Sequence, residues 1–381
     1  MADSEFGDVM AAIRDQWASM AGMAGMFTFS ILLGVFIQPF YNFEMYRAFG
    51  EEGTTEAGNI LLELVMIFIF TAVVIWLARK GLDYVIKGVV FFALGYSLMI
   101  ALQPLLWIVY SLVGIQSDLG YIFAVLLFPI GMMYLLHKFP EWYVVNSVGL
   151  LVGSGVIVML GITFVPVLII LFMVLAAIYD HWAVNGSKHM LELADTMIDL
   201  KLPVLLVAPK STDYTFLEQK GDVMEKSHDE PTVPVESPMP PKKVKSRDAL
   251  FMGLGDVIFP GMLVISSITF LPEVGPVVFE FWGGDSIPVH LGPMVVGMGT
   301  LVGGLVGYAA LMTQVARGKA QAGLPLLNGG SILGYLISGT IALGFDQLWQ
   351  DITFLCFANN DLKGGGRAKR PITMLEMTMF R

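Results

Sequence analysis

Long apolar runs separated by short polar segments are the dominant pattern of this chain. A helix that crosses the hydrocarbon core of a bilayer needs roughly 20 mostly apolar residues, and the pattern predicts nine such helices. Seven are delimited directly, over Ala18–Pro39, Asn59–Leu77, Gly88–Val113, Leu119–Leu136, Ala249–Leu271, Leu291–Ala316 and Leu326–Phe345.

The remaining two helices come from one apolar stretch, Trp142–Val184, which is too long for a single crossing. Gly161, Thr163 and Pro166 interrupt this stretch, and glycine and proline are the residues that most often end a helix. We therefore predict a break near Gly161. An odd number of spans places the two ends of the chain on opposite sides of the membrane.

Composition agrees with an all-α polytopic membrane protein. Hydrophobic residues make up 56% of the 381 positions, charged residues only 14%, and the mean hydropathy is +0.71, whereas a soluble domain has about 25% charged residues. The net charge of −10 and the lack of a large basic block argue against nucleic-acid binding. A single cysteine and five scattered histidines exclude an intrachain disulfide and predict no metal site.

Lysine and arginine are distributed unevenly between the two sides of the predicted membrane. The loops after even-numbered spans hold almost all of them, while the loops after odd-numbered spans hold only Arg47. The positive-inside rule then places the N-terminus and the long sixth loop in the cytoplasm. The basic residues of the C-terminal tail run against this orientation, but such late charges have less influence.

The sixth loop, residues 185–248, holds 20 of the 54 charged residues. Its first part, Lys188–Leu206, alternates charged and apolar residues and predicts an amphipathic helix at the membrane surface. Its second part, Ser211–Pro241, is polar and rich in proline, which predicts a flexible linker. The chain thus divides into a six-helix part (1–184), this loop, a three-helix part (249–345) and a tail (346–381).

Three carboxylates lie well within predicted spans, namely Glu63, Asp180 and Asp256, and no lysine or arginine shares those interiors. Charged groups inside a membrane are costly and mark functional sites by default. Asp180 lies eight residues before the first cation after its span, and Asp256 lies nine after the last cation before its span. At 1.5 Å per residue, both lie about 12–14 Å below the cytoplasmic face, whereas Glu63 lies near the outer boundary and is interpreted as a snorkelling carboxylate.

Two carboxylates at equal depth on consecutive antiparallel helices can face each other and share one proton. An aspartyl protease needs this arrangement, because the ionised carboxylate takes a proton from water while the protonated one polarises the scissile carbonyl. Gly253-Leu254-Gly255 precedes Asp256 and leaves room for a second backbone. Near the same side, Leu324–Leu327 contains a proline, which predicts a non-helical segment able to pair with a substrate strand.

Tyr179-Asp180, Gly253-Leu254-Gly255-Asp256 and Pro325-Leu326-Leu327 occur in the order and spacing of the motifs of presenilins and signal peptide peptidases, and the chain resembles that family. The resemblance implies a nine-helix intramembrane aspartyl protease without cofactor. Asp180 and Asp256 would be the catalytic pair. The residues that would contact substrate are Tyr179, Gly253, Leu254, Gly255, Leu324, Pro325, Leu326 and Leu327.

The stretch from Lys188-His189-Met190 to Asp199-Leu200-Lys201-Leu202-Pro203 resembles the archaeal branch of the family in particular, which implies an archaeal cell membrane. Presenilin-type members keep the sixth loop in the cytoplasm, and the distribution of lysine and arginine favours that type. Leu326 stands where the family's P-A-L motif has alanine. The substrates would be transmembrane segments of other membrane proteins, and nothing in the sequence indicates an accessory subunit.

A proton-coupled transporter or cation leak channel could use the same two carboxylates as a relay. Transporters often contain interrupted helices in both of two related halves, whereas the interruptions here cluster in the last four spans, which favours the enzyme. Ser154, between two glycines, has no intramembrane histidine to act as its base and is interpreted as a packing residue. Gly299, Gly303 and Gly307 share one face of a span and predict close helix packing.

Overall fold

The computed structural model describes residues 2–114, 117–182, 205–210, 214–215, 249–280, 287–316 and 323–352. Most of the predicted amphipathic helix lies outside these residues, and its last two positions, Leu205 and Leu206, belong to a strand. The predicted linker lies outside them except at Tyr214 and Thr215, and so does most of the C-terminal tail.

The described part of the chain contains nine α-helices, in agreement with the expected all-α polytopic membrane fold. Seven are long and apolar enough to cross a membrane. They are α1 (Ala2–Ile37), α2 (Ala57–Arg79), α3 (Asp83–Val113), α4 (Asp118–Lys138), α5 (Trp142–Gly161), α9 (Leu291–Ala316) and α10 (Leu324–Ala342).

The other two helices, α6 (Pro166–Trp182) and α8 (Leu254–Phe270), are apolar but have only 17 residues each. The break between α5 and α6 falls where it was predicted, since α5 ends at Gly161. A Cβ atom on Gly161 would come within 2.5 Å of the Cβ of Ile265 in α8. Glycine therefore both ends α5 and lets α8 approach it closely.

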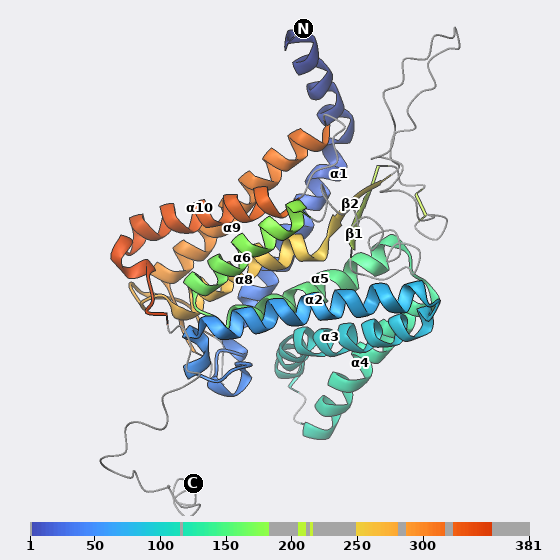
Figure 1. Ribbon diagram of the computed structural model, residues 1–381. Helices are drawn as coiled ribbons and strands as arrows, with labels where there is room; N and C mark the ends of the chain where they lie inside the picture. Colours follow the sequence, from blue (N-terminus) through green and yellow to red (C-terminus); the bar gives the residue numbers. More distant parts are fainter. Residues whose placement is uncertain are drawn as a thin grey trace, which may run out of the picture.

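The helix α8 occupies the centre of the bundle, where it contacts α1, α5, α6, α9 and α10. Figure 1 shows α6 and α8 between the α9–α10 pair on one side and the group formed by α2, α3, α4 and α5 on the other. Large apolar side chains of α2 and α4 are mostly exposed, as expected for helices that face lipid. The two helices that carry the intramembrane aspartates are thus in the interior.

Close packing of α9 against α10 depends on glycines of both helices. A Cβ on Gly303 would collide with the carbonyl oxygen of Gly330, and a Cβ on Gly299 would collide with Ser338. A Cβ on Gly307 would likewise collide with the carbonyl oxygen of Leu326. The predicted small face of the eighth span is therefore confirmed, and it allows the backbones of α9 and α10 to come into contact.

Two short antiparallel sheets interrupt the otherwise helical fold. The strand β1 (Leu205–Pro209) pairs with β2 (Ala249–Gly253), and β3 (Val277–Phe279) pairs with β4 (Val289–His290). The expected seventh span began at Ala249, but residues 249–253 are extended and the helix begins at Leu254. Glycine disfavours helix at this boundary, and pairing with β1 satisfies the backbone groups instead.

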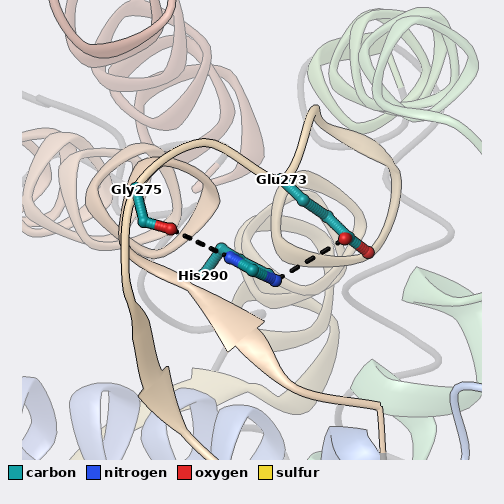
Figure 2. A network of polar contacts seen from close by, with 3 residues as sticks. All are labelled: Glu273, Gly275 and His290. Atoms are coloured by element: carbon teal, nitrogen blue, oxygen red, sulfur yellow. Dashed lines mark hydrogen bonds and ion pairs between the residues drawn. The ribbon is translucent and has the colours of Figure 1, made fainter.

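One histidine contributes to the connection from α8 to α9, beside the β3–β4 pair. In Figure 2, Nδ1 of His290 lies 3.1 Å from the carbonyl oxygen of Gly275, and Nε2 lies 3.5 Å from the carboxylate of Glu273. These contacts join the residues after α8 to the residue before α9. This network lies at the end of α8 opposite Asp256, which is in the first turn of that helix.

Candidate active site

Asp180 lies two residues before the end of α6, and its side chain is buried with 8% of its surface exposed. Its Oδ2 accepts a hydrogen bond of 3.3 Å from the backbone N–H of Leu324. That N–H belongs to the first residue of α10, where a helix has no internal acceptor for it. Asp180 therefore binds the free N-terminal end of another helix.

Asp256 is the third residue of α8, which begins directly after the strand β2. Its carboxylate lies near Gly253, the residue that caps this helix, since a Cβ on Gly253 would be 3.4 Å from Oδ2. The carboxylate also lies against Gly323, since a Cβ on Gly323 would be 3.2 Å from Oδ2 and 3.3 Å from Oδ1. Asp256 as a residue is half-buried.

The two aspartates meet at the start of α10, because Gly323 and Leu324 are consecutive residues and each contacts one of the two carboxylates. This arrangement agrees with the prediction that the sixth and seventh spans bring these side chains together. The chemistry such a pair can perform is the activation of one water molecule by one ionised and one protonated carboxyl group.

The expectation of a non-helical segment at Leu324–Leu327 is wrong. These four residues form the first turn of α10, with Pro325 among its first two residues. Proline is well tolerated there because the N–H that it lacks would have no partner within the helix. The extended segment next to the aspartates is instead the β1–β2 pair, which leads directly into Asp256.

The other predicted substrate-contacting residues lie in different surroundings. Gly255 is exposed next to Asp256, whereas Leu254 and Leu327 are buried in the core. Leu326 is partly buried against α9, where its carbonyl oxygen meets Gly307. The ring of Tyr179 packs edge-to-face on Phe68 of α2, with 4.7 Å between the ring centroids.

Sequence reasoning missed Asn328, which connects the helices on both sides of the site. Its side chain is 1% exposed, and its Nδ2 donates a 2.9 Å hydrogen bond to the carbonyl oxygen of Met173 in α6. The bond ties α10 to α6 near the contact between Leu324 and Asp180. An amide inside an apolar span was the signal that could have revealed it.

Two other residues considered from the sequence lie on helices that do not carry the aspartates. Ser154 is fully buried, and its Oγ donates to the carbonyl oxygen of Leu151 in the same helix, as expected for a packing residue. Glu63 is in α2, which contacts α3 and α6. Within the described ranges, no three His, Cys, Asp or Glu side chains are grouped so that they could hold a metal ion.

Comparison with known proteins agrees with this geometry. The family model described as signal-peptide peptidase, presenilin aspartyl protease matches residues 24–344. The chain belongs to this family. It is accordingly an integral, multi-pass membrane protein and an intramembrane aspartyl protease, and the transporter interpretation is not favoured. No match is found among the curated proteins.

Two solved structures, both of a presenilin family intramembrane aspartate protease, are similar to this member of the family. One, in space group C222, is 25% identical with a TM-score of 0.52. The other, in space group P2, is 26% identical with a TM-score of 0.54. Each match covers 86% of this chain and 100% of the other, so the likeness extends over the helices on both sides of the aspartates.

Proposed function

We propose that Asp180 and Asp256 are the catalytic pair with which this protease hydrolyses peptide bonds in transmembrane segments of other membrane proteins. One observation carries the proposal: two carboxylates from different helices contact consecutive backbone residues, Gly323 and Leu324. Both come from short helices in the interior of the bundle, where no lysine or arginine lies in either helix to neutralise them.

In the proposed reaction, the ionised carboxylate takes a proton from water, and the water oxygen attacks the carbonyl carbon of the scissile bond. The protonated carboxyl group donates a hydrogen bond to the carbonyl oxygen, on which negative charge develops. The carbon–nitrogen bond then breaks as the amide nitrogen receives a proton from the pair. Because a helix hides its backbone in its own hydrogen bonds, the substrate has to unwind locally before this attack.

The division of the chain follows from this proposal. Residues 1–184 supply Asp180, residues 249–345 supply Asp256 and the start of α10, and residues 185–248 connect them on the cytoplasmic side of an archaeal cell membrane. The predicted cytoplasmic N-terminus can be tested by attaching a membrane-impermeant label to cysteines introduced at Ser4 and Ser117, which the proposed topology places on opposite sides.

Cleavage of a labelled transmembrane peptide by detergent-purified protein tests the catalytic assignment. We expect Asp180→Asn and Asp256→Asn, which are nearly isosteric, each to abolish cleavage while the protein elutes as a folded monodisperse species. Glu63→Gln is the matched control, because it removes a third intramembrane carboxylate and is expected to leave cleavage unchanged. Full activity in either aspartate variant would contradict the assignment.

A further inference from the structure

The strand β1, which pairs with the strand that leads to Asp256, is bound by an amide side chain of α5. Asn146 is buried, and its Nδ2 donates a 2.7 Å hydrogen bond to the carbonyl oxygen of Val207 in β1. In return, the backbone N–H of Val207 donates to Oδ1 of Asn146 at 2.8 Å. The side chain thus uses its donor and its acceptor on the same residue.

This contact has the geometry of a neighbouring strand. In an antiparallel pair, alternate residues direct both backbone groups away from the partner strand. Val207 is opposite Phe251 of β2, and its two backbone groups point to Asn146. The amide of Asn146 therefore completes the outer edge of β1, and the hydroxyl of Ser19 in α1 adds a 2.9 Å bond to the carbonyl oxygen of Pro209.

The contact between Asn146 and Val207 can control the register in which β1 pairs with β2. The observed pairing runs from Leu205 opposite Gly253 to Pro209 opposite Ala249. A slip by one residue would move β2 by about 3.4 Å and turn each of its side chains to the other face. Because α8 begins directly after β2, the same slip would displace Asp256, the third residue of α8.

We infer that Asn146 is a positioning residue of this protease: it fixes β1 at Val207, and the β1–β2 pairing in turn fixes the place of Asp256. This inference rests on the proposed function, in which Asp256 is catalytic. Asn146 lies in α5 and directs two side-chain hydrogen bonds to Val207, so it acts on Asp256 through the paired strands.

Two substitutions at one position test the inference. In Asn146→Leu the side chain keeps a similar size but leaves both backbone groups of Val207 without a partner. In Asn146→Asp the protonated acid reproduces the pattern of the amide, because its O–H donates and its carbonyl oxygen accepts. The ionised acid has no proton to donate, so one of its acceptor oxygens faces the carbonyl oxygen of Val207 and the two repel each other.

We therefore expect Asn146→Leu to lower kcat by about 10- to 100-fold at every pH. Asn146→Asp should match wild type at acid pH and lose kcat as the pH rises, when each rate is divided by the wild-type rate at the same pH. Rates are expressed per folded molecule, so that a loss of folded protein alone leaves them unchanged. Ser147→Asp is the matched control, since it adds a carboxyl group on the exposed side of the same helix turn and is expected to show no such loss.

Wild-type kcat in Asn146→Leu would overturn the inference, and so would an Asn146→Asp variant that is as slow as Asn146→Leu at every pH. If Asn146→Leu does not fold, the pH dependence of Asn146→Asp carries the test. Hydrogen exchange at residues 205–209 and 249–253 should show lost protection in Asn146→Leu. That measurement reports strand pairing even if Asp180→Asn and Asp256→Asn prove active, so failure of the proposed function would remain distinguishable from failure of this inference.

Discussion

The backbone N–H of Leu324 donates a 3.3 Å hydrogen bond to the carboxylate of Asp180. The preceding residue, Gly323, lies against the carboxylate of Asp256, so one peptide segment touches both acids. The first turn of α10 therefore sets the separation of the two carboxylates as well as supporting each of them. Changes in this turn should alter catalysis more than they alter folding.

Gly323→Ala should lower cleavage with little loss of stability. The added Cβ would come within 3.2–3.3 Å of both oxygens of Asp256, so the carboxylate has to move by a few tenths of an ångström. Because catalysis depends steeply on the placement of reacting groups, we expect kcat to fall by about 10-fold. The measurement is steady-state cleavage of a transmembrane peptide together with thermal unfolding in detergent.

Gly329→Ala provides the control for this substitution in the same helix. A Cβ at Gly329 meets nothing within 4 Å, so the variant should cleave at the wild-type rate. Equal rates for Gly323→Ala and wild type would show that the contact between Gly323 and Asp256 does not affect the reaction.

The pH dependence of kcat/KM should be bell-shaped if the two aspartates act as one unit. The reaction requires one ionised and one protonated carboxyl group, so activity falls at low pH when the ionised group gains its proton. Activity also falls at high pH, when the protonated carboxyl group loses its proton. The profile is measured with wild type in detergent, after confirming that the protein remains folded over the pH range, and a rate that rises without a second limb would contradict the shared role.

Gly303→Ala should destabilise the protein through the contact between α9 and α10. The new Cβ would collide with the carbonyl oxygen of Gly330, and overpacking of this kind lowers the free energy of unfolding by about 1–3 kcal/mol. Gly131→Ala in α4 is the control, because a Cβ there meets nothing within 4 Å. Because glycine is unfavourable within a helix, Gly131→Ala should raise the free energy of unfolding by about 0.5–1 kcal/mol. Equal unfolding midpoints for the two variants would argue against the close α9–α10 contact.

Tyr179 and Phe68 should be energetically coupled. Their rings meet edge-to-face at 4.7 Å between centroids and connect α6 to α2. Aromatic pairs of this geometry contribute about 0.5–1.5 kcal/mol beyond burial. A double-mutant cycle with Tyr179→Leu and Phe68→Leu, followed by thermal unfolding, measures the coupling. Additive losses would show that the two rings stabilise the protein independently.

Much of this structure could be predicted from the sequence because its strongest signals are local. Apolar runs of span length located the helices, and Gly161 with Pro166 located the break between α5 and α6. Nearly equal spacing of Asp180 and Asp256 from the nearest cations, eight and nine residues, predicted that these residues meet. Both inferences need only neighbouring residues and the thickness of a bilayer.

The features that could not be predicted depend on contacts between distant residues. The pairing of β1 with β2 joins residues 40 to 48 positions apart, and the bond from Asn146 to Val207 joins α5 to a strand that follows α6. Proline at Pro325 suggested a non-helical segment, although proline is also common in the first turn of a helix. In the structure, the carboxylate of Asp180 accepts a hydrogen bond from the backbone N–H of Leu324, and this contact between distant residues favours the helical alternative.

The short length of α8 has a consequence for what surrounds Asp256. Seventeen residues rise about 26 Å, which is less than the roughly 30 Å of a typical hydrocarbon core. The chain before α8 is strand and not helix, and non-helical backbone inside a membrane is tolerated only where it is buried in protein or borders water. Pairing of β2 with β1 meets that requirement and keeps lipid chains away from the end of α8 that carries Asp256.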